Sequence, residues 1–123
     1  MFPTRSGRSY LVCGLLLAAL VAVPALWAHA APVSMTPAAN SVVSAPENLT
    51  IHFSEELEQK LCTIAVTDAS GHAVTKAAAS AGTDAKTMTV KLLPLSPGVY
   101  NVHWVAVSTD THRSQGDYKF TVK

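Results

Sequence analysis

The stretch VYNVHWVAV, residues 99–107, decides the fold of this chain. His103 lies on one face of the extended stretch, and the apolar residues Tyr100, Val102, Trp104 and Ala106 lie on the other. A period of two is typical of a β-strand, because neighbouring side chains of a strand point to opposite faces. We therefore expect a long strand here, with its apolar face turned to the core.

Shorter segments of the same character lie on both sides of this strand. Strands are expected at residues 49–53, 61–67, 86–92 and 117–123, and an extended edge segment that contains prolines at 32–37. Turns or loops are expected at residues 38–41, 45–48, 68–72, 77–85, 95–98 and 113–116. Residues 54–58 fit either a helical turn, with Ser54 as its N-cap, or a polar loop. About seven short strands and no long helical pattern predict an all-β fold, an antiparallel β-sandwich or barrel in one domain.

The first 28 residues have the organisation of a secretory signal. Arg5 and Arg8 precede an apolar run, residues 11–23, which is short for a membrane span. An uncleaved membrane anchor is the alternative. Cleavage after Ala28 would leave His29 as the first residue of the mature chain. Cleavage after Ala30 fits the preference for small residues better, because the cut after Ala28 places a leucine at the −3 position.

Residues 29–123 form a nearly neutral domain with one cysteine. The signal holds two of the nine basic residues, so seven basic and eight acidic residues remain, a net charge of about −1. This balance argues against nucleic acid as a partner, and after processing we expect no stable membrane insertion. Cys62 has no second cysteine to pair with in this part, so the domain depends on a well-packed core, which a bound metal can stabilise further.

Directly after the long strand comes Ser108-Thr109-Asp110-Thr111-His112. Residues i and i+2 of an extended chain share a face, so Asp110 and His112 could bind one metal ion. A free His29 terminus would add its α-amine and its ring Nδ1. Three nitrogens and one oxygen suit Cu(II), although zinc also binds such ligands. A polar turn without metal is the alternative reading of Asp110 and His112.

Five segments of residues 29–123 form a specific pattern when they are taken together and in order. They are HAAPVSMTPA from residue 29, IHFSEEL from 51, DAKTM from 84, LSPGVYNVHW from 95 and STDTHRSQGDYKFTV from 108. With them the mature chain resembles the CopC family of periplasmic copper-resistance proteins over essentially its whole length. The resemblance implies a Greek-key β-sandwich, immunoglobulin- or cupredoxin-like, that binds one Cu(II) through His29, Asp110 and His112. It also favours cleavage after Ala28, and so a signal peptide at residues 1–28 and a CopC-like copper-binding domain at residues 29–123.

The function implied by this resemblance is copper binding without catalysis. The protein would bind Cu(II) in the periplasm and sequester it or deliver it, with an inner-membrane copper transporter of the CopD type as the expected partner. Two departures from the family pattern stand out. The middle of the chain, residues 67–76, contains no methionine, so we predict no methionine-rich Cu(I) site. Arg113 occupies the position after the motif histidine where a proline is usual.

Three other functions compete with the copper carrier. A histidine N-terminus with a second histidine is also the copper arrangement of the monooxygenases that cleave polysaccharides oxidatively. Against this reading, Asp110 would fill a coordination position that oxygen activation needs open. A blue-copper protein needs a cysteine and two histidines in one site, and no such cluster is present near the C-terminus. The third is an extracellular β-sandwich module without metal.

Overall fold

The computed structural model describes residues 29–123 of the chain. The predicted signal peptide, residues 1–28, lies outside the described residues. Within the described part, one short 3-10 helix, η1 (Gln59–Leu61), is the only helical element. No helix of this part is long and apolar enough to span a membrane.

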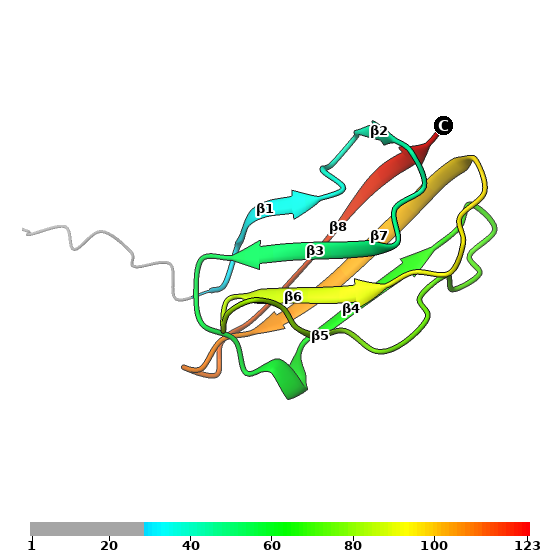
Figure 1. The fold of residues 1–123 in the computed structure, drawn as a ribbon. Coiled ribbons are helices and arrows are strands. Elements are labelled where there is room, and N and C mark those ends of the chain that lie inside the picture. Colours follow the sequence, from blue (N-terminus) through cyan, green and yellow to red (C-terminus); the bar gives the residue numbers. More distant parts are fainter. Residues whose placement is uncertain (1–28) are drawn as a thin grey trace, which may run out of the picture.

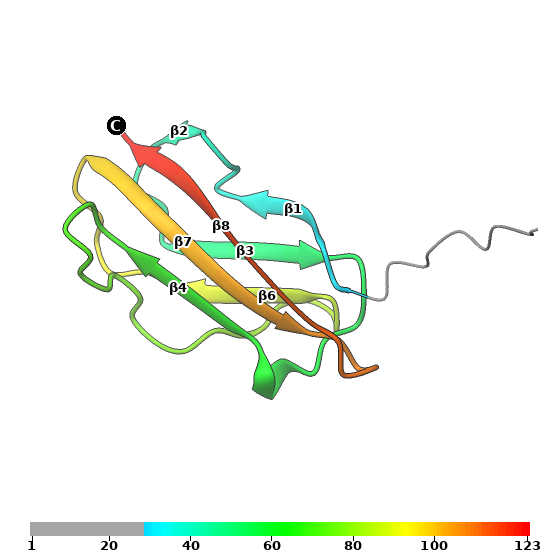
Figure 2. The same cartoon turned by 180° about the vertical axis from the view of Figure 1, so that it is seen from behind.

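Two four-stranded sheets face each other (Figures 1 and 2). The first sheet has the order β1 (Pro32–Thr36), β3 (Asn48–Phe53), β6 (Thr87–Lys91), β5 (Ser80–Ala81). The second sheet has the order β2 (Val42–Val43), β8 (Arg113–Val122), β7 (Gly98–Val107), β4 (Thr63–Thr67). The chain crosses between the sheets at every connection from β1 to β5 and again between β6 and β7, which gives the interleaved order of a Greek key. The predicted all-β sandwich is confirmed, and β1 lies at a sheet edge as expected.

The core between the sheets is built from the alternating residues. The apolar face predicted for residues 99–107 is buried, and alternate residues of the other strands join it: Leu49, Ile51, Phe53, Met88, Val90, Leu92, Tyr100, Val102, Trp104, Ala106, Phe120 and Val122. Tyr118, on the same face of β8 as Phe120, is only partly buried. Phe53 of the first sheet meets Trp104 of the second edge to face, with ring centroids 5.4 Å apart. Such a pair stabilises a protein by about 0.5–1.5 kcal/mol beyond its buried area. This contact therefore holds the two sheets together near one end of the sandwich.

The turn predicted at residues 113–116 is wrong. These residues begin β8, which pairs with β7 in one antiparallel register from Val107 opposite Arg113 to Gly98 opposite Val122. The chain reverses earlier, at residues 108–112. The composition Arg-Ser-Gln-Gly is typical of turns, but β7 is long enough to pair with every residue of this segment, and the ladder outweighs the local preference.

Two smaller predictions need correction. The sandwich is not wholly antiparallel, because β2 pairs with β8 in parallel. The strand expected from residue 61 begins at Thr63, after η1. Of the two readings of residues 54–58, the loop is confirmed. The described part contains eight strands, two of which, β2 and β5, have only two residues, in line with the number expected. Ser54 caps no helix: its hydroxyl accepts a hydrogen bond from the Ala31 N–H (3.0 Å).

Gly116 lies directly beneath the indole ring of Trp104. A Cβ atom built on Gly116 would stand 2.6 Å from Cζ2 of Trp104, closer than real Cβ contacts. Trp104 is itself buried and packs against Phe53, so a movement of its ring disturbs that contact. Glycine at this position is therefore required by the packing of Trp104.

We predict that Gly116→Ala destabilises the fold. Overpacking of this kind costs about 1–3 kcal/mol, more than the stabilisation of up to about 1 kcal/mol that alanine brings by restricting the unfolded chain. Urea unfolding should show a lower midpoint for Gly116→Ala. The exposed Lys119→Ala on the same strand is the control and should leave the midpoint almost unchanged. An unchanged midpoint for Gly116→Ala would contradict this account of the packing.

Candidate metal site

The hairpin loop between β7 and β8 presents Asp110 and His112 at one end of the sandwich. The Ser108 N–H donates to the His112 carbonyl (3.0 Å), and the Thr111 N–H donates to the Ser108 carbonyl (2.8 Å). Thr111 has a φ of 75°, in the left-handed region that non-glycine residues rarely adopt. The loop is thus a tight, closed turn, and its backbone fixes the distance between the two predicted ligands.

Asp110 is bound to His112 within this turn. Its Oδ2 lies 3.1 Å from Nδ1 of the His112 ring. Its Oδ1 accepts a hydrogen bond from the Ser108 hydroxyl and another from the His112 N–H (3.2 Å). The Ser108 bond, followed by the His112 N–H, lowers the pKa of Asp110 from its usual value near 3.8 to about 2. The carboxylate is therefore charged at neutral pH, and the contact at Nδ1 leaves Nε2 of His112 as the outward ring nitrogen.

His29 meets His112 from the other end of the chain. The two imidazole rings have their centroids 5.3 Å apart and stand at 74° to each other. In Figures 1 and 2 the start of the described chain and the β7–β8 loop lie at the same end of the sandwich. The first residue of the described part and the hairpin loop thus form one corner of the molecule.

The segment after His29 is anchored to both sheets. The Ala30 side chain is 1% exposed and belongs to the core. Its carbonyl accepts a hydrogen bond from the Ser114 hydroxyl of β8 (2.5 Å). Ala31 exchanges two hydrogen bonds with Ser54, one to the Ser54 hydroxyl and one from the Ser54 N–H to the Ala31 carbonyl (2.8 Å). These contacts place His29 next to the hairpin.

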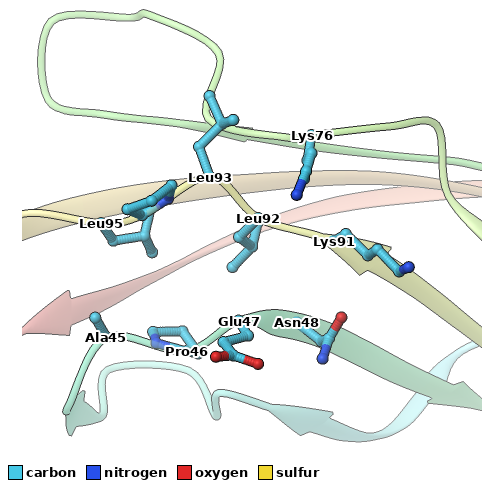
Figure 3. Close-up of a pocket in the computed structure, with 10 residues that line it drawn as sticks. Ala45, Pro46, Glu47, Asn48, Lys76, Lys91, Leu92, Leu93 and Leu95 are labelled. Atoms are coloured by element: carbon cyan, nitrogen blue, oxygen red, sulfur yellow. The ribbon is translucent and has the colours of Figure 1, made fainter.

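A groove of about 540 Å³ opens beside His29. Trp104 and the anchored segment, residues 30–32, line its apolar part, and Glu55 and Gln115 contribute polar side chains. A larger groove, of about 710 Å³, lies at the opposite end of β3 and β6 (Figure 3). Its lining includes Glu47, Lys76 and Lys91 but no histidine or cysteine, so it lacks the ligand chemistry that copper prefers.

The other histidines lie apart from this corner. His52 shares a hydrogen bond through Nδ1 with the Thr87 hydroxyl (2.8 Å), and His103 contacts Asp117 (2.8 Å). His72, in the exposed turn predicted for it, lies 3.6 Å from Asp68. Across residues 29–123, no three His, Cys, Asp or Glu side chains stand together as a ready-made metal cage. The structure thus joins the predicted ligands in two pairs that share His112.

Cys62 is buried beneath the hairpin and does not join the corner. Its thiol receives a hydrogen bond from the Val107 N–H (3.3 Å) and lies 3.4 Å from the Glu58 carbonyl. Burial raises the pKa of this thiol above its usual value. A buried, protonated thiol is a poor metal ligand, because the thiolate is the form that binds.

Comparison with known proteins assigns the described domain to a family. Residues 32–123 match the CopC domain family. The chain belongs to the CopC family. The match includes Asp110 and His112 but begins after His29, so the assignment of His29 depends on the geometry described above.

Relatives of known name link the CopC family to copper resistance. The chain is 42% identical over 103 residues to copper resistance protein C of Pseudomonas syringae pv. tomato. The aligned region covers 78% of this chain and 82% of that protein. It is 36% identical over 111 residues to protein YobA of Escherichia coli K12, covering 88% and 90%. The similarity thus extends over most of the length of both relatives.

Two solved structures share the fold. CopC from Methylosinus trichosporium OB3b superposes with a TM-score of 0.72 at 29% identity, over 77% of this chain and 94% of that one. PcoC from Escherichia coli, described as a methionine-rich copper resistance protein, gives 0.70 at 40% identity, over 78% and 100%. The present CopC chain has only Met35 and Met88 after the first residue, so it differs from PcoC in this respect.

Sequence analysis did not find the residues that hold the corner together. Ser114 carries no signal of its own in the sequence, Ser54 was considered only as the N-cap of a helical turn, and Ala30 only as part of a cleavage site. Their roles depend on which strands lie side by side. Trp104 was expected in the core, but its place beside His29 follows only from the packing of the two sheets.

We predict that Ser108→Ala raises the pKa of Asp110 toward 3.8. The Ser108 hydroxyl is the largest cause of the lowered value, so its removal destabilises the carboxylate. In the wild type, the stabilisation from the charged carboxylate is present above about pH 3.8 and is lost as the pH falls through about 2. NMR titration of the carboxyl carbons measures the shift.

Asp84 is the internal control for this titration. Its pKa is lowered by the Thr87 hydroxyl and the Lys86 N–H, and the Ser108→Ala change should leave it unaltered. An Asp110 that still titrates near 2 in the variant would show that the His112 N–H dominates instead.

Proposed function

We propose that this CopC protein binds one Cu(II) ion at the corner formed by His29, Asp110 and His112, and sequesters or delivers it in the periplasm. The observation that supports the proposal most is the 5.3 Å approach of the His29 and His112 rings. Two imidazoles at this separation reach a common metal ion with small side-chain rotations. The role is transport or storage, and no step of catalysis is proposed.

The donor set is made of three nitrogens and one oxygen. His29 supplies its ring Nδ1 and, after processing, its α-amine, and His112 supplies Nε2 because Asp110 holds Nδ1. Asp110 either turns toward the metal as an oxygen ligand or stays on His112 and orients the ring. In both roles its negative charge offsets part of the charge of the ion. A set of this kind suits Cu(II), and the scarcity of thioether sulfur makes it unsuited to Cu(I).

The structure supports a mature chain that begins at His29. Cleavage after Ala30 would remove a side chain that lies in the core and the carbonyl that Ser114 binds. Cleavage after Ala28 keeps both and frees the amine of His29. We therefore propose residues 1–28 as the signal peptide and residues 29–123 as the copper-binding domain, with an inner-membrane transporter of the CopD type as the recipient.

We predict that His29→Ala and His112→Ala abolish tight Cu(II) binding. Each change removes a ligand, so the affinity should fall by more than the roughly 10–100-fold expected when a residue that merely supports a ligand is lost. Competition titration of the processed protein, followed by native mass spectrometry, measures the affinity and the one-to-one stoichiometry. For Asp110→Ala, we expect a loss of Cu(II) affinity within that range of about 10–100-fold.

His52→Ala, His72→Ala and His103→Ala are the matched controls, because each removes an imidazole that lies outside the corner. They should bind Cu(II) as the wild type does. Tight binding by His112→Ala would sink the assignment.

We also predict that one extra residue before His29 weakens Cu(II) binding to nearly the level of His29→Ala. The extension turns the amine into a peptide nitrogen and separates it from the chelate with Nδ1. Intact mass of the secreted protein establishes the natural first residue. Equal affinity of the extended and the processed chains, or a natural chain that begins at Ala31, would refute the amine as a ligand.

A further inference from the structure

We propose that Ser114 and Ser54 are positioning residues for the copper corner, an inference that rests on the function proposed above. Together their side chains hold the two residues after His29, and in this way they set the distance between His29 and His112. Their hydrogen bonds go to the backbone of Ala31 and Ala30 and not to the histidine rings, so both serines act through the backbone of the N-terminal segment.

Ser114 links the strand that follows His112 to the residue that follows His29. It is the second residue of β8 and follows His112, which lies just before the strand, by two residues. The His112 ring meets His29, and the Ser114 hydroxyl donates to the carbonyl of Ala30, the next residue of the N-terminal segment. Two neighbouring contacts therefore align the segment with β8.

Ser54 holds the same segment from the other sheet. Its two hydrogen bonds with Ala31 extend the β1–β3 pairing by one step beyond Pro32 opposite Phe53. The segment is thus fixed to β3 by Ser54 and to β8 by Ser114, with the Ala30 side chain buried between the sheets. Chain termini fray unless they are tied down, so a ligand at the first position needs such anchors.

The test uses the processed protein, with its first residue verified as His29 by intact mass. Ser114→Val removes the hydroxyl, and Ser114→Thr keeps it in a side chain of the same shape; both β-branched residues suit a strand. Ser41→Ala is the matched control, because the Ser41 hydroxyl makes the same kind of bond, to the Ala38 carbonyl (2.6 Å), near the far end of β8. Cu(II) affinity, the EPR spectrum of the copper-loaded protein and urea stability are measured for each.

We expect Ser114→Val to lower the Cu(II) affinity by about 10-fold or more, as for other residues that orient a ligand, and to change the EPR spectrum. Ser114→Thr, which keeps the hydroxyl, should have the Cu(II) affinity and the EPR spectrum of the wild type. Ser41→Ala should lose stability but keep the affinity and the spectrum of the wild type. Ser54→Ala should weaken binding in the same way, and it decides the matter if Ser114→Val does not fold.

Three results would overturn the inference: wild-type affinity and spectrum in Ser114→Val, equal loss in the valine and threonine variants, or wild-type affinity and spectrum in Ser54→Ala. A wild-type protein that takes up no Cu(II) would instead overturn the proposed function itself. The two failures are therefore distinguishable, because the second is seen before any variant is made.

Discussion

The uninterrupted pairing of β7 with β8 is the constraint on which the rest of this structure depends. It places Val102, Trp104 and Phe120 in the core and leaves only residues 108–112 to reverse the chain. A reversal this short, closed by its own backbone hydrogen bonds, has few conformations available. The strand register therefore places Asp110 and His112 at the end of the sandwich. Ser114 follows them in the second residue pair of the ladder, opposite Ala106.

The second half of the site comes from the opposite end of the chain. His29 meets the hairpin only when the first sheet has formed and packed on the second, since its anchors are Ser54, directly after β3, and Ser114 of β8. The corner is thus a property of the folded protein. A metal ion that binds there binds the native state and not the unfolded chain, so copper and folding stabilise each other. For a small domain without a disulfide, this linkage adds to the stability supplied by the core.

Sequence alone predicted the parts of the structure in which local pattern and tertiary packing agree. The alternation in residues 99–107 and 49–53 marks both the strands and their buried faces. Prediction failed at residues 113–116, where turn-forming composition is overruled by pairing with a long neighbouring strand. It also missed β5, whose two residues join a sheet edge without any hydrophobic pattern. Spacing predicted that Asp110 and His112 lie together, but on the premise of an extended chain, whereas the structure brings them together through a turn with Thr111 in the left-handed region. The approach of His29 needs the fold or a resemblance to reveal it.

Under the proposed function, the ionised Asp110 carboxylate favours a cation at a corner that is open to solvent. Asp110 and His112 are both about half exposed, so desolvation adds little to the interaction with a metal. Affinity must then come from the number of donors and from their placement before the ion arrives. The turn supplies placement for Asp110 and His112, and the anchors on Ala30 and Ala31 supply it for His29. A site that is accessible, yet organised by backbone contacts rather than by burial, fits the proposed role, in which the protein both holds an ion and releases it to a partner.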